Sequence, residues 1–154
     1  MQAKEGFTLV ELIVVIVIVG IVALIAAPRF FAQAGFDAAR FHDTAISAIR
    51  YGQKVAVAQR TNVFVAVSTT SLALCYDIGC VTAVTQPADS AAFVITAPNN
   101  ISLTGSSFSF TSLGQPASFA ASPVPLAANA TFSIVGDVTA RQIVVEQETG
   151  YVHK

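Results

Sequence analysis

Hydrophobic residues dominate the start of the chain. Residues 7–27 form a run of 21 residues in which Glu11 is the only charged side chain. A helix of this length rises roughly 31 Å at about 1.5 Å per residue, which is enough to cross a hydrocarbon core. A cleaved secretory signal usually has an apolar region of only about 7–15 residues. The pattern therefore predicts a transmembrane helix over residues 7–27.

The pattern becomes amphipathic after Pro28. Small and apolar residues recur every three or four positions, which places them on one face of a helix. Charged residues lie mostly off that face, and the small residues predict a close approach to a sheet. We therefore expect one nearly continuous helix from about residue 8 to about residue 59, with residues 28–60 as its amphipathic part. The residues on the apolar face are Ala34, Ala38, Phe41, Ala45, Ile49, Gly52 and Ala56.

Helix signals stop near Thr61. Short β-branched and aromatic runs follow, separated by pieces rich in Gly, Pro, Asn and Ser, and this arrangement is typical of an antiparallel β domain. A segment rich in Ala, Ser and Pro over residues 117–129 predicts a long loop. The expected fold class is α+β, a long N-terminal helix packed on a β domain of residues 61–154. The expected strands are 62–67, 72–75, 93–96, 101–103, 108–111, 130–135, 142–146 and 151–153.

Composition and charge narrow the function classes. Charged residues make up only 11% of the 154 residues, against roughly 25% in typical soluble proteins. The formal net charge of −1 gives no electrostatic reason to expect a nucleic-acid partner. The helix carries basic residues that could form a polyanion-binding stripe. Interleaved aspartates favour a solvated face or subunit contacts instead. These basic residues are Arg40, Arg50, Lys54 and Arg60.

Glu11 is the unusual residue of the apolar run. A carboxylate in the middle of such a span costs about 2.5–3.5 kcal/mol on insertion scales. Nothing else in residues 7–27 can neutralise it. We therefore predict that the partner of Glu11 belongs to another chain.

The residues around Glu11 resemble a known signature. Gly6-Phe7-Thr8-Leu9-Val10-Glu11 is similar to the prepilin peptidase recognition and N-methylation motif of type IV pilins and type II secretion pseudopilins. The resemblance implies a leader of residues 1–6, cleavage between Gly6 and Phe7, and methylation of the Phe7 amine. It implies that Glu11 meets the amino terminus of a neighbouring subunit, and that Pro28 kinks the helix. The physics agrees, because a buried carboxylate and a cationic amine would compensate each other.

The resemblance also implies a place in the cell and a set of partners. We expect a single-pass inner-membrane protein with its β domain in the periplasm, which later enters a pilus or pseudopilus. Its partners would be other pilin subunits, the prepilin peptidase, the assembly platform of the inner membrane and membrane lipid. The layout of the helix and strands resembles the FimT and pseudopilin H-like group of minor subunits, with an MSHA-type pilus as one setting. The mid-chain cysteines also favour a minor subunit, which would aid filament initiation and assembly.

Alternatives stay open at this point. The chain could be an adhesive or DNA-binding tip pilin, a major structural pilin, or an unrelated bitopic protein with a chance glutamate. Some members of the FimT-like group are associated with DNA binding through a Gly-Arg-x-Arg motif near the carboxyl terminus. Here Tyr151 and His153 replace the arginines after Gly150, which argues against DNA.

The two cysteines, Cys75 and Cys80, predict a disulfide that closes a small loop in an oxidising compartment. Free thiols and a metal site are the alternatives, but a metal needs further ligands and neither His42 nor His153 is near in sequence. We place His42 on the helix surface and His153 in an exposed tail. No catalytic motif appears, and Asp89 is the only charged residue between 78 and 136. We therefore expect neither an enzyme nor a cofactor.

Overall fold

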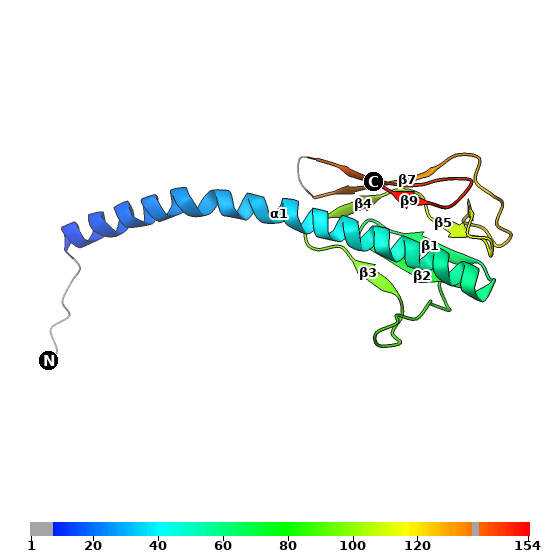
Figure 1. Ribbon diagram of the computed structural model, residues 1–154. Helices are drawn as coiled ribbons and strands as arrows, with labels where there is room; N and C mark the ends of the chain where they lie inside the picture. Colours follow the sequence, from blue (N-terminus) through cyan, green and yellow to red (C-terminus); the bar gives the residue numbers. More distant parts are fainter. Residues whose placement is uncertain (1–7, 137–138) are drawn as a thin grey trace.

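The computed structural model describes residues 8–136 and 139–154, and it describes side chains in these ranges apart from those of residues 25–34. Gly6, Phe7 and the leader of residues 1–6 lie outside the described residues. Figure 1 shows a long helix whose first part projects away from a β domain, while its second part lies against that domain.

The predicted continuous helix is confirmed. Helix α1 runs over Leu9–Gln59. The hydroxyl of Thr8 accepts a hydrogen bond from the backbone N–H of Glu11 at 3.2 Å, so Thr8 is the N-cap residue. Arg60 ends the helix in the left-handed conformation, with φ 52°, and its N–H donates to the carbonyls of Ala56 and Val57. The helix continues through Pro28 and curves gently in Figure 1. A sharp kink at Pro28 stays a prediction.

Two antiparallel sheets make up the rest of the described chain. A five-stranded sheet has the order β3-β2-β1-β5-β6, and a four-stranded sheet has the order β4-β7-β8-β9. The first sheet contains β1 (Val63–Val67), β2 (Ser71–Cys75), β3 (Val94–Thr96), β5 (Phe108–Phe110) and β6 (Pro116–Ser118). The second contains β4 (Ser102–Thr104), β7 (Ala130–Val135), β8 (Arg141–Val145) and β9 (Val152–His153). The α+β fold class is therefore confirmed.

The core lies between the second half of α1 and the sheets. Ala38, Ala45 and Ala56 are almost completely buried, and their small side chains let the helix backbone approach the strands. The aromatic rings of Phe108 and Phe132 fill the space between the sheets, with ring centroids 5.4 Å apart. The described residues of the predicted apolar face that are buried therefore contact the core.

One strand was missed by the sequence pattern. Strand β6 begins at Pro116 and occupies the start of the predicted 117–129 loop. Its Pro-Ala-Ser sequence carries no β-branched or aromatic residue, so it gives no strand signal. Proline is tolerated here because β6 is the last strand of its sheet, next to β5.

The disulfide prediction is confirmed. Cys75 at the end of β2 is bonded to Cys80. Within the closed loop, the Asp77 carboxylate accepts hydrogen bonds from the N–H groups of Val81 at 3.0 Å and Thr82 at 2.6 Å. These bonds hold the pKa of Asp77 below its ordinary value of 3.8, because they favour the charged form.

Removing this disulfide gives the first testable expectation. The double variant Cys75→Ala and Cys80→Ala should lose about 2 kcal/mol of stability, since the unfolded chain regains the entropy of a short loop. Chemical denaturation of the purified variant measures the loss. The variant Asp77→Asn, which keeps the disulfide but weakens the two N–H bonds, is the matched control. A midpoint equal to that of the wild type would show that the covalent link adds nothing to stability.

Candidate functional site

The projecting part of α1 has a surface that water does not favour. Every residue from 8 to 24 is exposed, and 15 of these 17 positions are apolar or glycine, with Thr8 and Glu11 as the exceptions. Leu9 is 73% exposed and Leu24 is 81% exposed. Monomeric soluble proteins rarely leave a continuous apolar surface of this extent uncovered, so this segment is built for an apolar environment or for other subunits.

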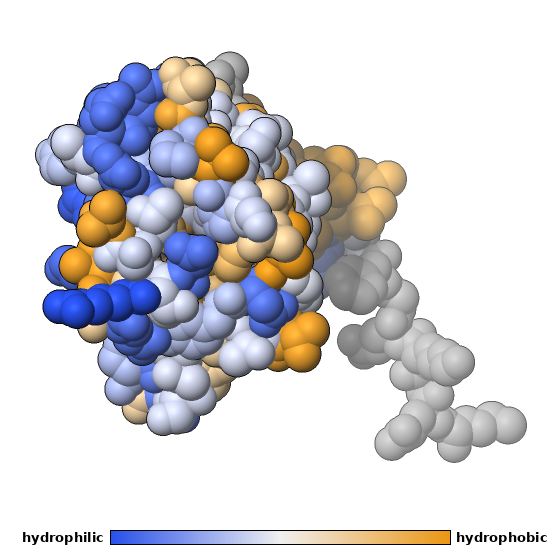
Figure 2. All heavy atoms as spheres, turned by 90° about the vertical axis from the view of Figure 1, so that its right-hand side faces the viewer, coloured by the Kyte–Doolittle hydropathy of each residue, from blue (hydrophilic) through white to orange (hydrophobic). Residues whose placement is uncertain are grey.

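Figure 2 shows the contrast with the β domain. The domain is viewed there from the end opposite the projecting helix, and blue hydrophilic residues alternate with small orange patches. Strongly hydrophobic residues gather behind this face. Among the described residues, no helix combines the length and the apolar character that a membrane crossing requires.

Glu11 lies in the first turn of α1, where its charge is locally favourable. The spacing Thr8-x-x-Glu11 is that of a capping box, and the observed half of this motif is the bond from the Glu11 N–H to the Thr8 hydroxyl. The carboxylate also lies near the positive end of the helix dipole. No side chain within the described ranges forms an ion pair with Glu11.

The contribution of Thr8 was missed by the sequence reasoning, although the Thr-x-x-Glu spacing signals it. Thr8 fixes where α1 begins, and it therefore fixes the position of Glu11 relative to the start of the helix. The predicted cut between Gly6 and Phe7 would leave a single residue before this cap.

Polar side chains near the C-terminal end of α1 also hold the β domain to the helix. Arg50 donates to the carbonyl of Val152 in β9 at 2.6 Å. Gln53 donates to the carbonyls of Gly114 and Thr149 at 2.9 and 3.0 Å, which joins two turns of the domain to the helix. Arg50 is thus a structural contact, which weakens the reading of the basic series as a polyanion-binding stripe.

His42 corrects a prediction. The sequence placed it on the helix surface, but it is only 4% exposed. Its Nε2 lies 2.9 Å from the carbonyl oxygen of Gln142, so it links α1 to β8. The hydrophobic pattern gave the wrong position for His42 because the apolar face predicted from it was too narrow. Position 42 lies one residue after the buried Phe41 and three before Ala45, and β8 covers that side of the helix.

The carboxyl terminus is likewise tied down. His153 Nε2 lies 2.8 Å from the Glu146 carboxylate, and Lys154 Nζ lies 3.0 Å from the Asp43 carboxylate. The hydrogen bond with Glu146 is the main cause that raises the pKa of His153 above its ordinary 6.5. The same bond lowers the pKa of Glu146 below its ordinary 4.5. The prediction of a free exposed tail was therefore wrong for His153, which forms the outermost strand.

This pair predicts a pH dependence. The raised pKa of His153 gives a stabilising contribution that is full below pH 6.5 and is lost as the pH rises through the raised value. The lowered pKa of Glu146 gives a second stabilising contribution. It is fully present above pH 4.5 and is lost as the pH falls through the lowered pKa. The pair should therefore stabilise the domain most between these two pH values. The denaturation midpoint of the wild type should exceed that of His153→Gln most in this window, and the difference should shrink towards pH 9. A difference that stayed constant with pH would contradict this, and Glu146→Gln should give the same profile.

No metal centre is found in the part of the chain that the structure describes, where no three His, Cys, Asp or Glu side chains come together. The predicted site residues also do not converge. Glu11 lies at the free end of α1, whereas Cys75 and Cys80 lie at the end of β2. The arrangement is that of an exposed apolar helical segment joined to a β domain.

Comparison with known proteins supports the reading of the N-terminal segment. Residues 1–27 match the family described as the prokaryotic N-terminal methylation motif. The chain carries this methylation motif. The match confirms the resemblance predicted from the residues between Gly6 and Glu11. No curated protein sequence matches the chain.

Two solved structures resemble a larger part of the chain, but more loosely. Both are crystal structures of the type IV minor pilin FimU of Pseudomonas aeruginosa, in space groups P21 and P65. They share 13% and 14% sequence identity with the chain, each with a TM-score of 0.48. The alignments cover 84% and 72% of this chain and 90% and 86% of those chains.

Proposed function

We propose that the chain is a minor pilin or pseudopilin, a structural subunit of a type IV pilus or of a type II secretion pseudopilus. The observation that carries this proposal is the methylation motif at the start of an exposed apolar helix, which leads without a break into the helix of a β domain. Such a molecule has one segment for a filament core and another for lateral contacts. Its role is structural and not enzymatic.

The first step of the proposal is processing. The prepilin peptidase cuts between Gly6 and Phe7, and the new Phe7 amine is methylated. The described start of α1 suits this cut, because Thr8 caps the helix and Phe7 would precede the cap directly. Residues 7–27 then hold the subunit in the inner membrane, with the β domain of residues 61–154 in the periplasm, before the assembly platform adds it to the filament.

The second step is registration of the subunit in the filament. Glu11 of one subunit meets the methylated Phe7 amine of its neighbour among packed apolar helices. Each charge alone would be costly there, and together they form a charge-assisted hydrogen bond. A hydrophobic interface alone permits sliding along the helix axis, whereas one buried charge pair selects a single register.

The third step is selection of neighbours by the β domain. The described polar contacts between α1 and the domain, above all those of Arg50 and Gln53, fix the orientation of the domain on the helix. The surface of the domain is then presented at a defined angle to the adjacent subunits. The sequence resemblance and the mid-chain position of Cys75 and Cys80 favour a minor over a major subunit.

Shearing of surface filaments tests this function. The chain should be recovered in the filament fraction of wild-type cells in far fewer copies than the main subunit. Deleting the chain should lower the number of filaments. The proportions of the other subunits in the remaining filaments should change little. Recovery of the chain in membranes alone, under conditions in which filaments form, would contradict the proposal. Recovery as the most abundant filament protein would make it a major pilin.

A further inference from the structure

Among the described residues, three of the four sheet edges are covered by other parts of the chain. Beside β6, the Ser118 N–H donates to the Val124 carbonyl at 2.8 Å, and the Leu126 N–H donates to the Pro116 carbonyl at 3.0 Å. Prolines at positions 123 and 125 of this covering segment remove two further donors. Beside β4, the outward N–H of Leu103 donates to the Thr69 carbonyl at 2.9 Å.

The third covered edge is β9. Its Val152 carbonyl accepts hydrogen bonds from the Arg50 side chain at 2.6 and 3.2 Å. A side chain of the helix thus occupies the position that another strand would take. In each of these three cases the fold itself satisfies backbone groups that would otherwise attract a foreign strand.

Strand β3 is different. It pairs with β2 in a register that sets Ile95 opposite Leu72. Two bonds flank this pair. The Leu74 N–H donates to the Phe93 carbonyl, and the Ala97 N–H donates to the Thr70 carbonyl. In an antiparallel pair, every second residue therefore directs its backbone groups towards β2. Ile95 therefore bonds inward, and the backbone groups of Val94 and Thr96 point outward.

The outward groups of β3 are largely unused. The Val94 N–H bonds locally to the Ala92 carbonyl at 2.9 Å. The N–H and carbonyl of Thr96 and the carbonyl of Val94 have no partner within the described ranges. An edge strand with free donors and acceptors is a template for one more strand.

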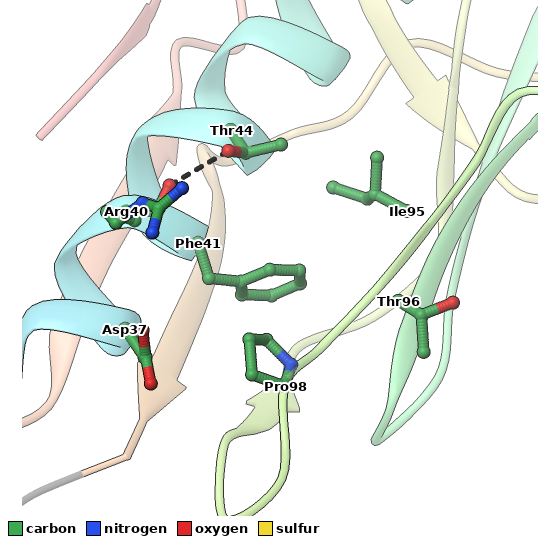
Figure 3. A pocket seen from close by; sticks show the side chains of 7 residues that line it. All are labelled: Asp37, Arg40, Phe41, Thr44, Ile95, Thr96 and Pro98. Atoms are coloured by element: carbon green, nitrogen blue, oxygen red, sulfur yellow. Dashed lines mark hydrogen bonds between the residues drawn. The ribbon is translucent and has the colours of Figure 1, made fainter. Parts of the chain in front are cut away.

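A groove runs between this strand and α1. It encloses a cavity of about 370 Å³ that is lined by Asp37, Arg40, Phe41, Thr44, Ile95, Thr96 and Pro98. In Figure 3 the Phe41 ring points from the helix towards Ile95 and Pro98 and forms an apolar floor. The cavity therefore joins a backbone edge to an apolar pocket, which is the combination that recognises extended peptides.

The helix wall of the groove adds charge. Asp37 and Arg40 line it, and neither forms an ion pair in the described part of the chain. They are three residues apart, which separates them by about 4.5 Å along the helix axis. Alternate side chains of a strand are about 6.6 Å apart on one face, and the long side chain of Arg40 can span the difference between the two spacings. A matching strand would carry one base and one acid two residues apart.

We propose that this groove binds an extended segment of a different polypeptide, which adds a strand to β3 and places an acid and a base opposite Arg40 and Asp37. A second copy of the chain fits less well. Three of its edges are covered, and antiparallel pairing of two β3 strands turns the two N-terminal helices in opposite directions. This last argument rests on the proposed function, in which all anchors share one direction.

Two blocked heptapeptides test the proposal, Val-Thr-Glu-Val-Lys-Thr-Val and Val-Thr-Lys-Val-Glu-Thr-Val, added to the full chain in detergent micelles. Hydrogen exchange at the Thr96 amide should slow by about tenfold at saturation, while the Ile95 amide, already bonded to β2, stays unchanged. One peptide should bind more tightly than the other. The double variant Asp37→Arg and Arg40→Asp should reverse that preference.

Two controls keep the test decisive. Thr96→Pro removes the outward N–H without touching the bonds between Ile95 and β2, so it should abolish peptide binding while amide protection in β1 shows that the domain is folded. A peptide methylated at its backbone nitrogens should not bind. Unchanged exchange at Thr96, or an equal effect of the methylated peptide, would overturn the proposal. A dimer of the full chain that Thr96→Pro dissociates would overturn it in favour of a second copy. None of these results depends on filament assembly. The peptide experiments therefore test the groove separately from the proposed function.

Discussion

Replacing Glu11 by alanine is expected to lower incorporation of the chain into filaments by about 100-fold or more. Removing one partner of a buried ion pair leaves the other charge uncompensated, which costs about 3–5 kcal/mol. Each 1.4 kcal/mol corresponds to a factor of ten in an equilibrium. The chain content of sheared filaments, relative to that of membranes, measures the loss.

The structure makes this substitution a clean one. The bond that caps α1 uses the backbone N–H of Glu11 and the hydroxyl of Thr8, so the helix should still begin at Leu9 in the variant. Glu11→Gln keeps the size of the side chain and removes the charge, and it should fail in the same way. Val10→Ala removes apolar contact without touching the charge and should be incorporated nearly normally. Incorporation of Glu11→Ala at the wild-type level would exclude a charge pair as the source of register.

Replacing Gly150 by alanine should cost the domain about 2–4 kcal/mol, through backbone strain together with overpacking. Gly150 has φ 66°, a region that side chains disfavour. A methyl group there would overlap the Gly114 carbonyl and would lie 2.5 Å from the Gln53 amide nitrogen. That nitrogen joins the helix to both turns, so relief of the overlap would break the junction.

Chemical denaturation of the purified protein measures the cost of this change. Gly79→Ala is the matched control, because a methyl group there meets only ordinary contacts, 3.4 Å or more away. The control should stay within about 0.5 kcal/mol of the wild type. Equal stability of Gly150→Ala and Gly79→Ala would show that the junction tolerates a side chain and does not fix the domain on the helix.

The long helix could be predicted from sequence because two different patterns support it. Residues 9–24 are apolar or glycine apart from Glu11, and residues 34–56 keep a helical period. Most strands could be predicted because β-branched and aromatic residues alternate with turn residues. Strand β7 was predicted with its observed bounds, Ala130–Val135. The pattern could not give β6, whose pairing is set by β5 and by the covering segment at residue 124.

Side-chain contacts between residues far apart in the sequence could not be predicted from the hydrophobic pattern. His42 and Gln142 are 100 residues apart, and nothing local reveals that β8 covers this position of the helix. The ion pair between Lys154 and Asp43 likewise depends on how the last strand docks. The open edge of β3 follows only from the complete hydrogen-bond pattern of both sheets. By contrast, the motif around Glu11 is local, so the sequence alone was enough to reveal it.

The mass of the mature amino terminus tests the account most directly. Intact-mass and peptide analysis of the chain from membranes or filaments should give a polypeptide that begins at Phe7 and carries one methyl group on its amine. A chain that retains residues 1–6, or one that begins at any other residue, would contradict its assignment to a filament.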